Sequence, residues 1–217
     1  MNELSLPARA YLLACDTRRD RLPDREHVAL LVRAAALTDL VLRGLVTDDG
    51  GRPAVTGDGG TGHLVLDDLL AELTADPHRK WRAWVRRGAR GTLQSLEAQL
   101  AAAGTIELRT SRVLGLFPRR HPVVRDAATA AALHDEVASA LRTEARVPAD
   151  VAALTALAAA VELGTVLPGR ERRRHRERLA QLEEQAGVTV PALRKVVREF
   201  RAARAAVVAS SSGSAGA

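Results

Sequence analysis

The sequence predicts a mainly α-helical protein, built as a single helical domain with short β-hairpins. Hydrophobic residues make up 47% of the 217 positions, yet only two Trp, two Phe and one Tyr are present. A core of this composition is built from aliphatic helix faces, on which Ala, Leu and Val recur at helical spacing. The length suits one core, so we expect a domain at residues 1–208 and a disordered Ser/Gly/Ala tail at residues 209–217.

In the first half of the chain, helical patterns alternate with turn signals. Gly44 is a natural stop for the long apolar helix that precedes it. The Asp49-Gly50 pair predicts a tight hairpin turn, because such pairs readily adopt the positive φ angles that these turns require. The expected elements are an opening apolar segment at residues 4–14, a polar loop or short hairpin at 16–24, a helix at 25–43, a hairpin at 45–55 and a helix at 64–74.

The second half is also helical, with one further hairpin. Trp81 and Trp84 lie in a strongly basic helix, and Pro148 stands at the first turn of a helix rich in alanine. We expect helices at residues 76–90, 92–103, 126–142, 149–163, 169–185 and 190–208, with a hairpin at 105–118 between the second and the third.

The hairpin at residues 105–118 has an unusual distribution of side chains. Residues 105–108 and 113–117 are expected to be strands around the Arg-Thr-Ser-Arg segment at 109–112. An apolar tip flanked by arginines suits insertion into an anionic membrane surface, or contact with another subunit. The alternative is an ordinary hairpin whose apolar face packs inward. The residues that would insert or self-associate are Arg112, Val113, Leu114, Leu116 and Phe117.

The chain is basic, with a formal net charge of +6, and its cations are almost all arginine. Lys80 and Lys195 are the only lysines. Arginine binds phosphate and carboxylate groups in a bidentate manner, so a partner that carries phosphates is favoured. Net charge does not distinguish a nucleic acid from a lipid surface. The arginines at residues 170–178 alternate with glutamates and are expected to form a solvated face.

The sequence indicates a cytoplasmic protein. Cys15 is the only cysteine, which fits a reducing compartment and excludes an intramolecular disulfide or a thiolate metal cluster. The first residues lack the basic start and long apolar run of a signal peptide. The longest weakly polar run, residues 147–168, contains Asp150 and Glu162 and falls short of a membrane span.

Nothing in the sequence indicates an enzyme, a metal site or a cofactor. No two of the six histidines have the spacing of a zinc-protease motif, and the glycine-rich loop at residues 57–62 lacks the lysine of a phosphate-binding loop. Asp67 and Asp68 stand in the first turn of a helix, where the helix dipole favours acids in any protein. The expected protein is therefore non-enzymatic.

A different class of function is a cytosolic helical DNA-binding regulator, using the helix and hairpin at residues 25–56. This arrangement resembles a winged helix. Asp48 and Asp49 at the tip of the hairpin would repel phosphates, and the preceding helix is too apolar to offer a face that reads a groove. Nucleic-acid binding is the less favoured alternative.

Three segments, taken in order, resemble the Golgi phosphoprotein 3 (GPP34) family over about residues 4–205. The opening segment and the long helix, with Tyr11-Leu12-Leu13, Leu31 to Ala35 and Leu40 to Gly44, are similar to the family's opening strand and its small-residue-rich helix. Thr61-Gly62 with Leu66, Asp67 and Leu70 resembles its second segment. The third segment comprises Leu96, Leu100, Gly104, Ile106, Leu114 to Pro118 and His121-Pro122.

The resemblance implies a mostly helical domain that binds phosphatidylinositol 4-phosphate in a basic pocket. By position, Arg33 and Arg90 match two of the family's pocket arginines. The positions of a further arginine and of the pocket tryptophan are occupied here by Leu93 and Asp24. The nearby arginines that could substitute for them are Arg86, Arg87, Arg18 and Arg21.

These observations lead to one hypothesis. The chain is a cytoplasmic, peripheral membrane protein that binds an anionic, phosphoinositide-like lipid headgroup through its arginines, while the apolar hairpin enters the interface or joins two subunits. The cytoplasmic tails of membrane proteins and a second copy of the chain are the expected protein partners, and no cofactor is expected.

Overall fold

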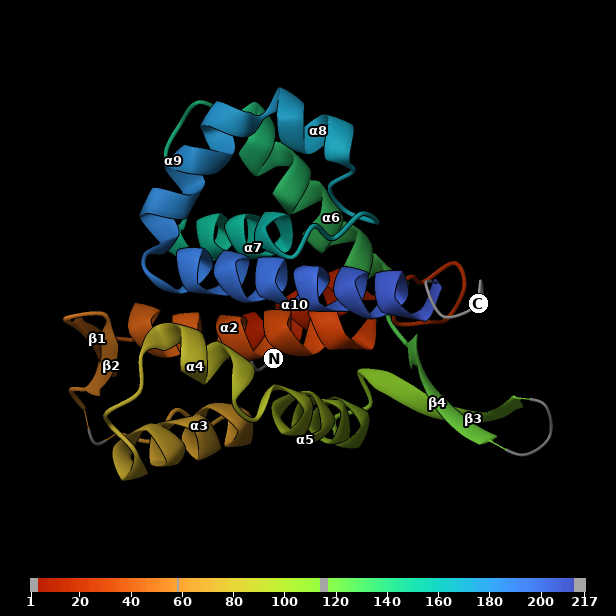
Figure 1. Ribbon diagram of the computed structural model, residues 1–217, viewed down its shortest axis with the longest axis horizontal. Coiled ribbons are helices and arrows are strands. Elements are labelled where there is room, and N and C mark those ends of the chain that lie inside the picture. The colour runs from red at the N-terminus through yellow and green to blue at the C-terminus, as the bar shows by residue number, and fades with distance from the viewer. Residues whose placement is uncertain (1–3, 58, 114–116, 213–217) are drawn as a thin grey trace.

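The computed structural model describes residues 4–57, 59–113 and 117–212 of the chain. Within these residues it forms ten helices and two antiparallel two-stranded hairpins, so the prediction of a mainly helical fold is confirmed. Figure 1 shows the helices stacked in layers above and below α2 and α10, with the second hairpin projecting from one side.

Helix α2 (Arg25–Leu42) is the centre of the core. Every residue from His27 to Leu40 is buried, and the helix contacts α1, α3, α4, α5, α7 and α10. Asp24 caps its N-terminus, where the carboxylate accepts a hydrogen bond from the backbone N–H of His27 at 3.3 Å. Because α2 is surrounded on all sides, it sets the relative positions of the elements that carry the candidate site.

The opening segment is a helix, α1 (Leu6–Ala14), and not the strand that the family resemblance implied. Pro7 stands in its first turn, where its missing N–H costs no hydrogen bond. The N–H of Leu6 instead donates to the carboxylate of Asp39 on α2 at 2.8 Å, which ties the start of α1 to the core. The polar loop that follows closes with a single bridge between Asp16 and Arg21.

The first hairpin, β1 (Val46–Asp49) and β2 (Arg52–Val55), confirms the predicted turn. Gly50 and Gly51 have φ angles of +56° and +83°, which residues with a side chain rarely adopt. The indole Nε1–H of Trp81 donates to the carboxylate of Asp48 at 2.5 Å. This hairpin is therefore anchored to the short helix that starts at Trp81, the second helix after it in the chain.

Three helices connect the two hairpins: α3 (Leu64–Ala75), α4 (Trp81–Arg86) and α5 (Ala89–Ala102). The prediction of one helix at residues 76–90 is wrong at both ends, because helical geometry starts only at Trp81 and stops before Gly88. Trp81 and Trp84 are the anchors of α4, with exposed fractions of 4% and 0%. Burial of these two rings holds a helix that is too short to be stable alone.

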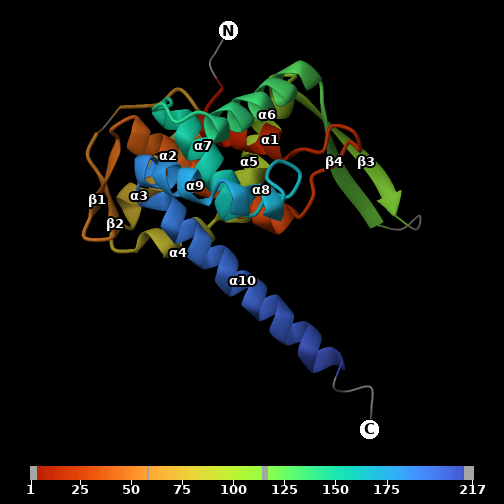
Figure 2. The same ribbon diagram turned by 90° about the horizontal axis from the view of Figure 1, so that it is seen from above.

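The second hairpin consists of β3 (Ile106–Val113) and β4 (Phe117–Val124) and projects from the helices in both views (Figures 1 and 2). The predicted turn at residues 109–112 is wrong, since these residues pair within the ladder and Val113 opposite Phe117 is the last pair. Ile106 is buried at the base. The described ladder therefore ends at the two outer residues of the apolar segment, Val113 and Phe117, and the remaining Leu114, Gly115 and Leu116 lie outside the described residues.

In the part of the C-terminal half that the structure describes there are five helices, and the helix predicted at residues 169–185 is two of them. His175, with φ −101° and ψ 26°, separates a short charged helix that buries no side chain from one that buries Leu182 and Ala186. The last helix reaches Ser212, within the segment predicted to be a tail, and Figure 2 shows its end extending away from the domain. The helices are α6 (Ala127–Arg142), α7 (Ala149–Ala160), α8 (Gly169–Arg174), α9 (Arg176–Ala186) and α10 (Thr189–Ser212).

The thiol of Cys15 gives the first testable consequence of this packing. Burial raises the pKa of Cys15 from 9.0 to about 12, and its exposed fraction is only 4%. The folded chain therefore keeps the thiol protonated where the unfolded chain ionises it, so folding loses stability as the pH rises above about 9. We expect iodoacetamide to alkylate Cys15 in the native protein only as fast as the chain opens. Alkylation at the rate of the urea-unfolded chain would contradict this expectation.

Candidate functional site

The junction between α4 and α5 has a backbone geometry that only glycine adopts without strain. Gly88 has a φ of +69° and is the N-cap of α5. A Cβ atom at this position would lie 3.5 Å from the Arg33 guanidinium, directly beneath the chain. Gly88 therefore lets the backbone turn sharply from α4 into α5 while resting on the side chain of Arg33.

Arg33 is buried beneath this junction, with 1% of its side chain exposed. Its Nε donates to the carbonyl of Trp84 at 3.2 Å, and its Nη1 donates to the hydroxyl of Thr92 at 2.9 Å. Its Nη2 pairs with Glu72 at 2.6 Å, and its guanidinium lies 5.8 Å from the Trp84 ring centroid. One cation from α2 thus joins α3, the end of α4 and the first turn of α5.

A concavity of about 310 Å³, which we call the α4–α5 concavity, lies beside this junction. It is bounded by the start of α2, the start of α5 and the middle of α10. The two predicted arginines that line it, Arg86 and Arg90, have side chains that are 63% and 77% exposed. Its apolar wall comes from α2 and α10. The lining residues are Glu26, Ala29, Leu30, Arg86, Gly88, Ala89, Arg90, Gly91, Val196 and Phe200.

Both arginines make ion pairs that solvent reaches. Arg90 pairs with Glu26 at 2.7 Å, and Arg86 lies 3.5 Å from Glu199 of α10, which also pairs with Arg82. Exposed pairs of this kind contribute little stability, so an anionic ligand can replace the carboxylates at small cost. The structure brings Arg86 and Arg90 together and leaves both accessible.

The first turn of α5 adds a second source of positive potential. Its N-terminus has neither an acidic residue in the first turn nor a side chain that caps it. The free N–H groups and the helix dipole of such a terminus favour a phosphate. Sequence reasoning missed this contribution; the Gly88-Ala89-Arg90-Gly91 segment was the signal that could have indicated it.

The remaining predicted arginines lie elsewhere. Arg87 turns toward Asp76 at 3.7 Å, with its guanidinium 5.9 Å from the Trp84 ring. A hydrogen bond from Arg79 lowers the pKa of the Asp76 carboxyl, and Arg87 adds to this effect. Arg21 lies 3.5 Å from Asp16, within the polar loop that follows α1. Arg18 lines a separate concavity beside Cys15 and His134.

The two positions that depart from the family pattern have structural roles. Asp24 is the N-cap of α2, in a left-handed conformation, and Leu93 is buried in α5 with 3% exposed. An aliphatic core residue at 93 offers no contact to a headgroup. Of the two α5 positions that the family resemblance marks, 90 and 93, the exposed side chain is therefore that of Arg90.

A comparison with protein families gives a direct result. The family model described as Golgi phosphoprotein 3 (GPP34) matches residues 6–200 of the chain. The chain belongs to the GPP34 family. The match spans every element from α1 to the middle of α10, including the candidate site, so the resemblance read from the sequence is confirmed. No curated protein matches the chain.

The hairpin of this GPP34 chain is described only in part. Arg112, Val113 and Phe117 occupy the ends of β3 and β4, while the predicted Leu114 and Leu116 lie outside the described residues. The membrane or subunit contact expected of these five residues remains a prediction.

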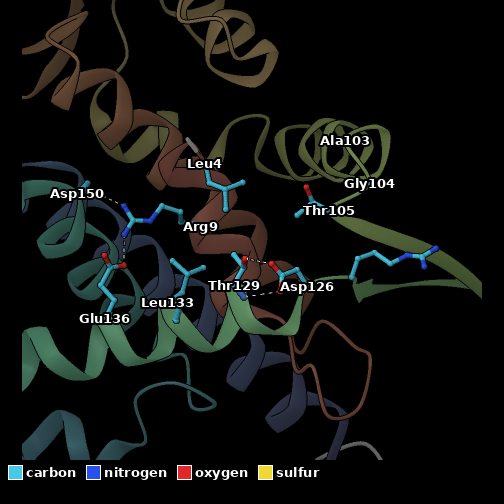
Figure 3. Close-up of a pocket in the computed structure, with 12 residues that line it drawn as sticks. Leu4, Arg9, Ala103, Gly104, Thr105, Asp126, Thr129, Leu133, Glu136 and Asp150 are labelled. Atoms are coloured by element: carbon cyan, nitrogen blue, oxygen red, sulfur yellow. Dashed lines mark hydrogen bonds and ion pairs between the residues drawn. The ribbon is translucent and has the colours of Figure 1, made fainter. Parts of the chain in front are cut away.

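A larger cavity, of about 850 Å³, lies at the base of this hairpin between α1, α5 and α6 (Figure 3). Figure 3 shows Arg9 between Glu136 and Asp150, with ion pairs to both. Asp126 accepts hydrogen bonds from the first turn of α6, and Arg125 pairs with Glu107. Three acids and two arginines line this cavity, whereas two arginines and one acid line the α4–α5 concavity, so the α4–α5 concavity is better suited to an anion.

Two further observations on this GPP34 chain concern metal-binding groups and membrane-spanning helices. Within the described ranges, no three His, Cys, Asp or Glu side chains are grouped so that they could hold a metal ion. None of the helices in the same ranges has the length and apolar character needed to cross a membrane.

Proposed function

We propose that this GPP34 protein is a non-enzymatic, peripheral membrane protein that binds an anionic lipid headgroup at the α4–α5 concavity. The observation that carries the proposal is the convergence of Arg86 and Arg90 on the uncapped N-terminus of α5. A headgroup phosphate there would replace Glu26 and Glu199 as their partner. Each basic residue near an anionic surface contributes about 1 kcal/mol, so binding by this site alone is weak and reversible.

Arg33 enters the proposal as a positioning residue. Its three hydrogen bonds and its contact with Gly88 hold the first turn of α5 where Arg90 faces the concavity. The direct headgroup contact predicted for Arg33 would require its buried guanidinium to leave those partners. The support it provides to the junction needs no such change.

The hairpin supplies the second half of the proposal. An apolar tip that enters the lipid interface adds a hydrophobic contribution to the electrostatic one. Used between two subunits, the same tip would give a dimer. Measuring the molecular mass as a function of protein concentration distinguishes these uses, because only the second predicts a mass that rises with concentration.

Phosphatidylinositol 4-phosphate is the headgroup that family resemblance suggests. We expect the native chain to co-sediment with vesicles containing this lipid more than with phosphatidylserine vesicles of equal surface charge. Arg86→Gln with Arg90→Gln should remove this preference. The control is Arg19→Gln with Arg52→Gln, which removes the same charge from exposed arginines outside the concavity.

The outcomes separate three cases. Loss of the preference in the Arg86/Arg90 variant alone supports the headgroup site. Equal losses in both variants would reduce the proposal to a nonspecific basic surface. If the native chain binds neither vesicle, the proposal is wrong. Leu116→Ser with Phe117→Ser tests the tip separately and should weaken binding to both lipids alike.

The DNA-binding alternative has no supporting observation. The helix that would read a groove is α2, whose residues His27 to Leu40 are all buried, and the hairpin after it is fastened by Asp48 to Trp81.

A further inference from the structure

A second basic concavity lies between the C-terminal end of α6 and the bend between α8 and α9. We call it the α8–α9 notch; its volume is about 700 Å³. Five arginines and two glutamates line it, an excess of three positive charges with His175 neutral. The lining residues are Leu141, Arg142, Thr143, Glu144, Arg173, Arg174, His175, Arg176, Glu177, Arg178 and Gln181.

The arginines of the notch divide into one that is structural and four that are available. Arg178 donates to the carbonyl of Ala140 at 3.0 Å and to that of Ala145 at 2.7 Å, which fastens α9 to the end of α6. Arg142, Arg173, Arg174 and Arg176 are exposed and have no ion pair or side-chain hydrogen bond within the described residues. Nearby Arg172, by contrast, is held by Glu162 and by the carbonyl of Leu167.

The chain bend adds to the positive potential of the notch. His175 is the N-cap of α9, an 11-residue helix whose start has no side-chain cap and carries one acid, Glu177, in its first turn. The N-terminal end of α9 therefore lies among Arg173, Arg174 and Arg176. Arginine side chains that converge on a helix N-terminus bind phosphate oxygens, which accept from several donors at once.

The position and chemistry of the notch distinguish it from the proposed lipid site. Figure 1 shows α8 and α9 at the opposite end of the molecule from α4 and α5, with α7, α10 and α2 between them. The notch and the α4–α5 concavity share no lining residue, so they are separate sites. Among the described residues that line the notch, the one large apolar side chain is that of Leu141, which is buried and so does not form an apolar rim that could enter a leaflet.

We propose that the α8–α9 notch binds a small soluble anion that carries two or more phosphate groups. This inference is independent of the proposed lipid function. The four available arginines can chelate adjacent phosphates, and the size of the notch is within the range of small-molecule sites. The ligand would occupy the notch while the other end of the domain contacts a membrane.

Inorganic triphosphate is the probe, titrated calorimetrically into the full chain at about 0.15 M salt, where long-range attraction is screened. All titrations start from the Arg86→Gln, Arg90→Gln variant, which we call the host. In this variant the α4–α5 concavity has lost both of its arginines and does not contribute to binding. Arg173→Gln, Arg174→Gln and Arg176→Gln are added to this host. The matched control adds Arg19→Gln, Arg52→Gln and Arg198→Gln, which removes equal charge from exposed positions outside the notch.

We expect the host to bind one triphosphate per chain. The dissociation constant should rise at least about tenfold in the notch variant and stay within about twofold of the host value in the control. Unchanged circular dichroism would show that the exposed substitutions leave the fold intact. Equal weakening in both variants, or absence of binding to the host, would overturn the proposal. Stronger binding of a short RNA or DNA than of triphosphate would also overturn it, because the notch would then serve a nucleic acid.

Discussion

Arg33→Ala is expected to lower the free energy of unfolding by about 3 to 5 kcal/mol, the largest effect of any single substitution considered for this protein. The side chain is 1% exposed, and its removal leaves the Trp84 carbonyl, the Thr92 hydroxyl and Glu72 without their donor. The cavity beneath Gly88 would add to the loss. Urea unfolding followed by circular dichroism measures it.

Arg90→Ala is the matched control for this prediction. The family resemblance gives both arginines one role, but Arg90 is 77% exposed and its ion pair with Glu26 is reached by solvent, so its loss should cost no more than about 1 kcal/mol. The free energy of unfolding of Arg33→Lys should lie between those of Arg33→Ala and the native chain, because one ammonium cannot reach three partners in the geometry of a guanidinium. Equal stabilities of the Arg33→Ala and Arg90→Ala variants would show that the network beneath the junction contributes nothing.

Glu97→Ala is expected to have the second largest effect, a loss of about 3 kcal/mol. Glu97 on α5 is buried and accepts hydrogen bonds from Tyr11 of α1 at 3.0 Å and from both terminal nitrogens of Arg25 at 2.8 and 2.7 Å. Without the carboxylate, a buried hydroxyl and a partly buried cation lose their partners. Burial also raises the pKa of Tyr11, so its hydroxyl stays protonated and needs an acceptor.

A double-mutant cycle isolates this network. Arg25→Ala and Glu97→Ala are measured separately and together by thermal unfolding, and we expect the double variant to lose clearly less than the sum of the two. Glu26→Ala, which removes an exposed carboxylate next to Arg25 in the chain, should change stability by less than about 1 kcal/mol. Strict additivity in the cycle would mean that Arg25 and Glu97 are not coupled.

The networks around Arg33 and Glu97 show why the sequence predicted the elements better than the site, since their members come from distant segments. Helix α2, the turn at Gly50-Gly51 and the start of the second hairpin were predicted within a few residues, because each depends on a local pattern of apolar residues or turn signals. The second strand of that hairpin, predicted at 113–117, instead spans Phe117–Val124. The residues around Arg33 come from α2, α3, α4 and α5. A pattern along the chain holds no information about partners this far apart in sequence.

The errors in the element boundaries have a similar cause. The turn at residues 109–112 was predicted from polar composition, but cross-strand pairing extends both strands beyond it. The helix expected at 169–185 breaks at His175, since α8 buries no side chain and the packing of α9 begins only after the bend. That bend forms one side of the notch, and its arginines at 173–178 were expected to form a solvated face.

The sequence by itself determined a mainly helical domain, its family and a basic character carried by arginine, because these depend on composition, periodicity and local motifs. Only the tertiary structure decided what each arginine does. Arg33 is enclosed beneath Gly88, Arg86 and Arg90 meet at the first turn of α5, and Arg173, Arg174 and Arg176 surround the start of α9. The physical reason is that the role of a cation depends on its burial and its partners, which packing between distant segments sets.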